Sequence, residues 1–326
     1  MQAYSLRSTN GQLALELTDA PQPVPQSGQV LVRVCASSLN RGEFIPRHGP
    51  GGKPGTLKPA GNEAAGEVVA VGPDVRGLKT GDRVMGRCPG AFAQYCLMDQ
   101  REAMPVPAAL SWEEAAAIPL VFMVAYDMLV AQGRMAAGES LLVAGVSSGV
   151  GVASLQMAKA MGIKVIGTSG SPEKLGRLDA LGLDVGICTR GADFLQAVMA
   201  ATDSKGVDLA VNAVGGTVFA ECLRALAYEG RLAMVGYVDG VLESRIDLDA
   251  LHARRLTLFG VSNKFRTTGQ RAALVRQFSA DMLPMFADGR IKPLVDKVYA
   301  FDQLPAARSC MEADLHVGKI VIRMPN

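Results

Sequence analysis

The chain lacks a Cys-x-x-Cys pair, an excess of one sign of charge and an apolar run long enough to cross a bilayer. Its six Cys stand far apart, which predicts reduced thiols rather than the disulfide framework of a secreted protein. With 33 Lys and Arg against 31 Asp and Glu, the net charge of +2 gives little general attraction for nucleic acid or an acidic membrane. We therefore expect a soluble, cytoplasmic protein with neither of these partners.

Apolar residues and glycine are plentiful. Apolar residues make up 49% of the 326 residues, enough to bury a core in each of about two domains. The 36 Gly follow no repeat, so we interpret them as tight turns and close backbone approaches. Such a composition is typical of nucleotide-binding enzymes.

Two sequence patterns divide the chain. β-Branched residues recur between Gly and Pro in residues 29–36 and 66–72, which predicts a β-rich first third. From about Leu141, apolar strands alternate with helical stretches such as 152–161. These apolar segments indicate strands covered by helices on both faces, and hence an α/β fold with a doubly wound parallel sheet. Its predicted strands are residues 141–144, 164–167, 185–188, 207–211, 232–235 and 256–259.

The first of these strands leads into a glycine-rich turn and then a helix. The turn reads Gly-Val-Ser-Ser-Gly-Val-Gly over residues 145–151. Free backbone N–H groups at such a helix start can bind a pyrophosphate, so we predict a dinucleotide site. Plain structural packing remains the alternative, since Val146 and Ser148 replace two glycines of the usual Gly-x-Gly-x-x-Gly pattern. The candidate cofactor-binding residues here are Ser147, Ser148, Gly149, Val150 and Gly151.

The segment after the second strand indicates which dinucleotide binds. An acidic side chain there would bind the ribose hydroxyls of NAD, and none is present. Instead Ser169, Ser171, Lys174 and Arg190 offer hydroxyls and cations, whose charge-assisted hydrogen bonds to a 2′-phosphate are worth about 1.5–3 kcal/mol each. We therefore predict NADPH in preference to NADH. Alternatively, or in addition, Ser171 caps a helix whose first residue is Pro172 and Lys174 is solvated.

Several motifs along the whole chain match a known family. They are Ala-Ser-Ser-Leu-Asn at 36–40, Gly-Asn-Glu-Ala-Ala-Gly at 61–66, Lys-Thr-Gly-Asp-Arg-Val at 79–84, Glu-Ala-Ala-Ala at 114–117, Ser-Gly-Val-Gly at 148–151, Asn-Ala-Val-Gly-Gly at 212–216 and Val-Gly-Lys-Ile-Val at 317–321. In order and spacing the chain resembles the zinc-independent quinone oxidoreductases of the medium-chain dehydrogenase/reductase superfamily, which include ζ-crystallin.

This resemblance implies the domain organisation. We expect a GroES-like β-rich catalytic domain at 1–118, a Rossmann NADP(H)-binding domain at 119–262, and a return to the catalytic domain at 263–326 that includes a strand at 319–323. The family further implies a cofactor in the cleft between the domains and a homodimer paired through Rossmann edge strands.

The resemblance also implies that no zinc is bound. Related alcohol dehydrogenases hold a catalytic zinc ion with Cys and His, and the matching positions here are Asn40 and Asn62. Neutral amides are poor zinc ligands beside thiolate and imidazole. Glu63, which lies near the metal in those relatives, is then either a buried structural carboxylate or a functional one.

Site residues are carried over from the family as expectations. Asn40 is expected to touch the nicotinamide ribose or the substrate, or else to be a turn residue. The remaining cofactor-binding candidates are Asn212, Val214, Gly236, Tyr237, Val261, Ser262, Asn263 and Lys319. Tyr237 has the alternative role of an exposed loop aromatic. The general acid is unidentified, with Tyr126 and His48 as candidates beside water.

Without a Lewis acid, the implied chemistry is hydride transfer from NADPH to an acceptor that is already electron-poor, such as a quinone or an enone. A second hypothesis is an enoyl-thioester or 2-alkenal reductase, for which Arg41, Arg47 and Lys53 would supply a basic patch. A third, from another class, is a crystallin-like protein that binds NADPH with little turnover.

Overall fold

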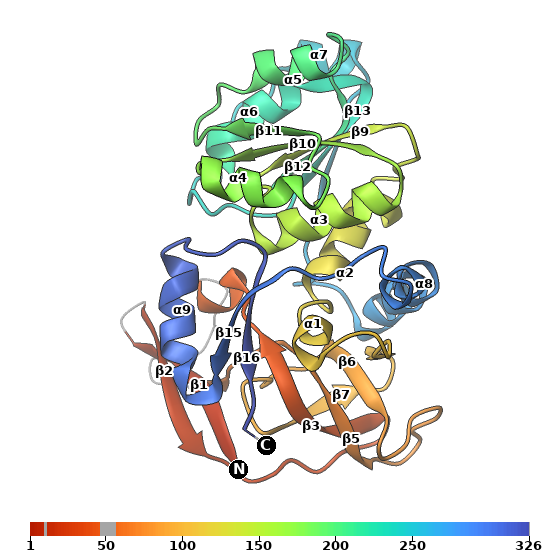
Figure 1. The fold of residues 1–326 in the computed structure, drawn as a ribbon, viewed down its shortest axis with the longest axis vertical. Helices are drawn as coiled ribbons and strands as arrows, with labels where there is room; N and C mark the ends of the chain where they lie inside the picture. Colours follow the sequence, from red (N-terminus) through yellow and green to blue (C-terminus); the bar gives the residue numbers. More distant parts are fainter. Residues whose placement is uncertain (10–11, 46–56, 326) are drawn as a thin grey trace. The chain divides into compact units, whose positions relative to one another are not determined.

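The computed structural model describes residues 1–9, 12–45 and 57–325, and the chain forms two compact units (Figure 1). Unit 1 comprises Met1–Leu120 with Thr268–Asn326, and unit 2 comprises Val121–Thr267. We expected the Rossmann domain to span residues 119–262, whereas unit 2 spans residues 121–267. The candidate residues His48, Arg47 and Lys53 lie outside the described residues.

Unit 1 is rich in β-structure. One sheet has the order β2-β1-β4, and a second, seven-stranded sheet has the order β15-β16-β3-β5-β6-β8, with β7 paired to β3. Its elements are β1 (Gln2–Thr9), β2 (Gln12–Asp19), β3 (Gln29–Ser38), η1 (Arg41–Phe44), β4 (Leu57–Pro59), β5 (Glu63–Val71), β6 (Arg83–Arg87), β7 (Tyr95–Asp99), β8 (Ala103–Pro105), α1 (Trp112–Ala116), α8 (Thr268–Ala287), β15 (Val295–Ala300), η4 (Phe301–Gln303), α9 (Leu304–Glu312) and β16 (Lys319–Arg323).

Strand β3 organises this second sheet, because it pairs antiparallel with β5, β7 and β16. The C-terminal strand β16 thus lies against a strand from the beginning of the chain. Gly66 allows the close approach of β5 to β3, since a Cβ atom at this position would stand 2.1 Å from the carbonyl oxygen of Arg33. Paired in this way, β3, β5 and β16 bring together side chains that are far apart in the sequence.

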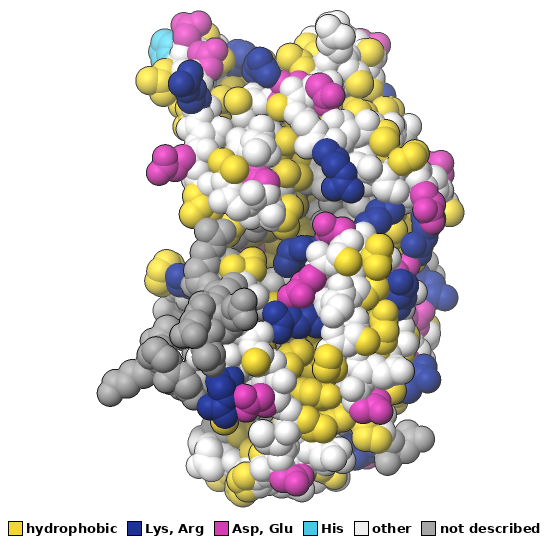
Figure 2. Space-filling model, turned by 90° about the vertical axis from the view of Figure 1, so that its left-hand side faces the viewer, with side chains coloured by type: hydrophobic (Ala, Val, Ile, Leu, Met, Phe, Trp, Pro, Cys, Tyr) yellow, Lys and Arg dark blue, Asp and Glu magenta, His cyan; other side chains and the backbone are white. Residues whose placement is uncertain are grey.

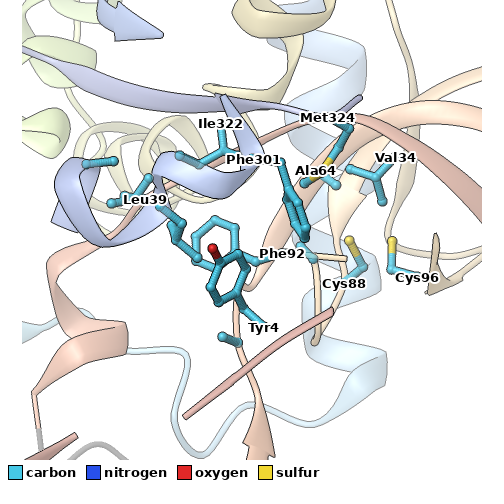
Figure 3. Packing of buried hydrophobic residues seen from close by; sticks show 14 of the residues in the cluster. Tyr4, Val34, Leu39, Ala64, Cys88, Phe92, Cys96, Phe301, Ile322 and Met324 are labelled. Carbon is cyan, nitrogen blue, oxygen red and sulfur yellow. The ribbon is translucent and has the colours of Figure 1, made fainter. Parts of the chain in front are cut away.

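The core of unit 1 joins both ends of the chain (Figure 3). Tyr4 from β1 packs edge-on against Phe301, with ring centroids 5.1 Å apart. Cys88 and Cys96 lie in the same cluster, and all six Cys of the protein are free thiols. Burial of residues from β1, β3, η4 and β16 in one cluster stabilises the return of the chain to this unit.

Unit 2 contains a six-stranded parallel sheet of order β11-β10-β9-β12-β13-β14. The predicted α/β class and doubly wound sheet are confirmed. In Figure 1, α3 and α4 lie on one side of this sheet and α5 and α6 on the other. Its elements are α2 (Val121–Tyr126), the π-helical turn η3 (Asp127–Ala131), β9 (Ser140–Ala144), α3 (Gly149–Ala160), β10 (Lys164–Ser169), α4 (Pro172–Asp179), β11 (Val185–Cys188), α5 (Leu195–Ala201), β12 (Val207–Asn212), α6 (Gly216–Arg224), β13 (Leu226–Met234), α7 (Leu248–Ala253) and β14 (Thr257–Gly260).

The strand order of unit 2 defines where a ligand can enter. The chain runs outward from β9 to β10 and β11, then returns to the other side of β9 with β12. In open α/β sheets, ligands bind at the carboxyl ends of the strands beside such a reversal. A nucleotide site in unit 2 is therefore expected at the ends of β9, β10 and β12.

On the face shown in Figure 2, basic and acidic side chains are interspersed among hydrophobic ones outside the residues drawn in grey. Among the described residues, no helix is both long and apolar enough to span a membrane.

Candidate functional site

The turn after β9 has the geometry of a phosphate-binding loop. Gly145 adopts a left-handed φ of +86°, which turns the chain away from the strand. Ser148 then caps α3, and its Oγ accepts a hydrogen bond of 3.1 Å from the N–H of Gly151. The N–H groups of Gly149 and Val150 lie in the first turn, where a helix has no acceptors of its own to offer them. They are thus placed to donate to an anion.

Gly151 allows α3 to start close to the strand. A Cβ atom here would lie 2.5 Å from the carbonyl oxygen of Gly145 and 2.6 Å from that of Val146. These are backbone atoms that no side-chain rotation can move. Only glycine fits at 151 without displacing the loop, as the sequence motif indicated.

The end of β10 lies beside this loop and carries no acid. Ser169 is buried, and its Oγ lies 3.2 Å from the Oγ of Ser147. Ser171 caps α4 by accepting from the N–H of Lys174 at 3.2 Å, with Pro172 at the helix start, so the predicted capping role is confirmed. Hydroxyls from the loop and from the strand end thus meet.

Arg190 joins this group from the end of β11. A Cβ atom at position 170 would lie 2.4 Å from the Cγ and 2.5 Å from the Nε of Arg190. Because residue 170 is glycine, the Arg190 side chain can fill this space. The guanidinium therefore lies over the backbone directly after β10. Ser147, Ser169 and Arg190 thus bring two hydroxyls and a cation to this strand end.

The end of β12 is organised by the buried side chain of Asn212. Its Oδ1 accepts from the N–H groups of Val214 and Gly215, both at 2.9 Å, and its Nδ2 donates to the carbonyl of Gly215. Asn212 therefore shapes the turn before α6. Gly236 lies next to this turn, with its N–H donating to the carbonyl of Asn212 at 3.3 Å, and Tyr237 beside it is half-buried.

The remaining candidate site residues of unit 2 lie either directly after β14 or in α2, before β9. Val261 is buried and its N–H donates to the carbonyl of Met234, while Ser262 is exposed and accepts from the N–H of Lys264. Tyr126 is 3% exposed in α2. Whether these residues hold a cofactor or move a proton stays a prediction.

Unit 1 contains a buried polar cluster around Glu63, which is fully buried at the start of β5. Its Oε1 accepts from the Oγ of Ser38 at 2.5 Å, the Nδ2 of Asn40 at 2.7 Å and the Nζ of Lys319 at 3.0 Å. Its Oε2 accepts from the N–H of Leu120 at 2.7 Å. A carboxylate with this many donors is satisfied as an anion, so Glu63 balances the charge of Lys319.

Asn40 and Lys319 are tightly held by the same cluster. Lys319 donates to the carbonyl of Leu39 at 2.7 Å and to the Oδ1 of Asn40 at 2.8 Å, in addition to Glu63. Asn40 uses its amide group to bridge two acids, Glu63 and Glu43. Asn40 and Lys319, both candidates from the sequence, thus lie in direct contact although 279 positions separate them.

Glu43 belongs to this cluster and was not singled out in the sequence. Its Oε1 accepts from the Nδ2 of Asn40 at 3.0 Å, and the side-chain amide of Asn62 also approaches the carboxyl group. Burial is the largest influence and raises the pKa of Glu43 to about 7. An acidic residue three positions after Asn40 was the available signal, but its burial depends on distant strands. No group of three or more His, Cys, Asp or Glu suited to a metal ion occurs among the described residues.

Comparison with known protein families matches both parts of the chain. Residues 26–108 match the alcohol dehydrogenase GroES-like domain, and residues 149–278 match the family described as zinc-binding dehydrogenase. The chain belongs to the medium-chain dehydrogenase/reductase superfamily. The resemblance inferred from the sequence motifs is thereby confirmed.

Two curated relatives show the range of this superfamily. The chain is 29% identical to the quinone oxidoreductase of Rattus norvegicus over 327 residues, covering 99% of this chain and 97% of the relative. It is 30% identical over 313 residues to a phenolphthiocerol/phthiocerol polyketide synthase of Mycobacterium tuberculosis, covering 96% of this chain. The chain spans only 14% of the length of that synthase.

Solved structures agree with this assignment. Mycobacterial Rv1454c complexed with NADPH aligns with a TM-score of 0.89 at 27% identity, covering 99% of this chain and all of the other. The CurK enoyl reductase aligns with a TM-score of 0.82 at 25% identity, covering the whole of both chains. These likenesses support an oxidoreductase of this superfamily.

Proposed function

We propose that the protein is an NADPH-dependent oxidoreductase that transfers a hydride to a quinone or another activated C=C or C=O acceptor without a zinc ion. The observation that carries the NADPH preference is the placement of Arg190 over Gly170 at the end of β10, beside Ser169 and Ser171. NADPH would supply the hydride. The loop 147–151 would bind its pyrophosphate, and Arg190 and Lys174 its 2′-phosphate.

The proposal that zinc takes no part rests on the donor set. Asn40 and Asn62 offer amides where zinc-dependent relatives have metal ligands, and both amides face the carboxyl group of Glu43. The Nδ2 of Asn40 is occupied by two acids, and an amide oxygen is a weak zinc ligand. Elemental analysis of the purified protein should find far less than one zinc per chain. A stoichiometric, tightly held zinc would overturn this part of the proposal.

A direct test compares cofactors and acceptors. NADPH should bind with a lower dissociation constant than NADH, and 9,10-phenanthrenequinone or 1,4-benzoquinone should accelerate NADPH oxidation. Lys174→Ala should raise the NADPH dissociation constant several-fold and leave that of NADH little changed, whereas Lys205→Ala, before β12, should change neither. Equal effects of Lys174→Ala on both cofactors would contradict the 2′-phosphate assignment.

A second candidate function is reduction of an enoyl thioester or 2-alkenal. Its support is the similarity to the CurK enoyl reductase and to the mycobacterial polyketide synthase. Turnover of trans-2-hexenal and of an enoyl thioester at higher kcat/KM than any quinone would favour this reaction over quinone reduction. NADPH binding without turnover of any of these acceptors would instead favour the crystallin-like role.

We also propose that two copies of the chain pair through β14. This strand lies at the edge of the parallel sheet and is only partly buried. Exposed apolar residues gather in the segment before it, at Val238, Val241, Leu242, Ile246 and Leu248. A second copy would cover both features. Sedimentation should therefore give the mass of a dimer, and Leu242→Asp should shift it toward the monomer.

A further inference from the structure

The segment that follows β14, residues 261–266, is folded into a compact turn within unit 2. Val261 is buried, and its N–H donates to the carbonyl of Met234, the last residue of β13, at 3.0 Å. Further along, the N–H of Arg266 donates to the carbonyl of Asn263 at 3.3 Å. The segment therefore lies beside the carboxyl ends of β13 and β14.

The strand order of unit 2 assigns the two halves of a dinucleotide to different strands. The proposed adenosine phosphate site lies at the ends of β10 and β11, around Arg190 and Gly170. On the other side of β9 the sheet continues with β12, β13 and β14. In a doubly wound sheet of this order, each half of the sheet binds one mononucleotide. The nicotinamide half of NADPH is therefore expected at the ends of β12, β13 and β14, where residues 261–266 begin.

An ion pair joins this segment to another part of unit 2. The Nη2 of Arg266 lies 2.8 Å from the Oδ1 of Asp127, and the two side chains are only 21% and 2% exposed. Asp127 belongs to η3, the π-helical turn after α2, and such turns are frequent at functional sites. The same guanidinium donates through Nη1 to the Oδ1 of Asn263 at 3.3 Å. Arg266 thus connects the side chain of Asn263 to a buried carboxylate.

Gln132 gives Asp127 a second connection, to the beginning of the segment. The Nε2 of Gln132 donates to the Oδ2 of Asp127 at 3.2 Å and to the carbonyl of Gly260, the last residue of β14, at 3.4 Å. The carboxylate of Asp127 therefore contacts residues that hold the segment at both of its ends. Because this carboxylate is buried, loss of its cation would leave an uncompensated charge, which makes the arrangement costly to break.

We propose that Asp127 and Arg266 are positioning residues that hold residues 261–266 in the conformation that binds the nicotinamide half of NADPH. The inference rests on the proposed function, in which NADPH supplies the hydride. A loop that is already ordered loses little conformational freedom when its ligand binds, so the ion pair increases the affinity for the part of the ligand that this loop contacts. The adenosine half, bound at other strands, should be indifferent to the pair.

The test compares NADPH with 2′,5′-ADP, which carries the adenosine and its 2′-phosphate but has no nicotinamide. Arg266→Met removes the cation and its contacts. It should raise the dissociation constant of NADPH at least about fivefold and change that of 2′,5′-ADP by less than about twofold. The fluorescence anisotropy of bound NADPH should fall, because the reduced ring is held less firmly. The matched control is Arg255→Met, at an exposed pair with Glu229 before β14, which should leave both dissociation constants and the anisotropy unchanged.

A second variant covers the case in which Arg266→Met does not fold. In the double variant Asp127→Asn with Arg266→Met, the buried carboxylate is gone as well, and the same selective loss of NADPH affinity is expected. Equal weakening of NADPH and 2′,5′-ADP in a folded variant would show that the pair only stabilises unit 2. That result, or unchanged binding of both ligands, would overturn the positioning role alone. Failure of the wild type to bind NADPH would overturn the proposed function and this inference with it.

Discussion

The side chain of Arg190 lies over the α-carbon of Gly170, in the space that any larger residue at 170 would occupy. The contact joins the residue directly after β10 to a residue in the turn that follows β11. Gly170 is therefore more than a flexible hinge between β10 and α4. It provides the site in which a guanidinium sits beside the hydroxyls expected to bind the adenosine ribose phosphate.

Gly170→Ala should weaken NADPH binding selectively. The new methyl group would displace the Arg190 side chain, which is exposed and can swing away at little cost to folding. We expect the NADPH dissociation constant to rise about tenfold, equivalent to about 1.4 kcal/mol, with that of NADH nearly unchanged. Calorimetric titration measures both. Gly176→Ala on α4, where a Cβ atom would meet nothing within 4 Å, is the control and should leave both constants unaltered.

Gly151→Ala should disturb the loop itself. Its methyl group would collide with two backbone carbonyl oxygens, so the loop or the helix start must move. Overpacking of this kind costs about 1–3 kcal/mol of stability, and the melting temperature should fall. Because the N–H groups of the first helical turn would move too, NADPH and NADH should both bind more weakly. A variant that binds both cofactors as tightly as the wild type would exclude this loop as the pyrophosphate site.

Lys319→Met should destabilise unit 1 by about 3–5 kcal/mol, because it leaves the buried carboxylate of Glu63 without its cation. The double variant with Glu63→Gln should lose less than the single one, since the uncompensated charge is gone. Urea denaturation of the single and double variants measures the difference. Lys292→Met, which removes a lysine whose side chain is 76% exposed in its pair with Glu114, should change the free energy of unfolding by less than about 1 kcal/mol. An equal loss in the single and double variants would contradict a buried ion pair.

Glu43 should make stability fall as the pH rises from 4.5 to about 7. Its pKa is raised from 4.5 to about 7, so folding disfavours the ionised form. Below pH 4.5 the group is protonated in both states, and above about 7 it is ionised in both. Across that window the wild type should lose roughly 3 kcal/mol relative to Glu43→Gln. Parallel curves for the two proteins in urea denaturation between pH 4.5 and about 7 would show that Glu43 is not buried in its neutral form.

Local features of the nucleotide loop could be predicted from the sequence because neighbours in the chain make them. The strand at 141–144, the glycines of 145–151 and the Ser171-Pro172 helix start need only hydrogen bonds and backbone preferences within a few residues. The apolar strands of the parallel sheet were predictable for the same reason, and the predicted segments correspond to β9 to β14.

What the amino-acid sequence by itself determined is thus the superfamily, the two structural patterns and the set of polar residues available to a cofactor. Only the tertiary structure decided which of them meet. Lys319 is 256 positions from Glu63, and Arg190 reaches Gly170 through the pairing of β10 with β11. The pKa of Glu43 is raised to about 7 chiefly because packing in the cluster buries its carboxyl group. Burial and long-range pairing set such energies, and no spacing along the chain encodes them.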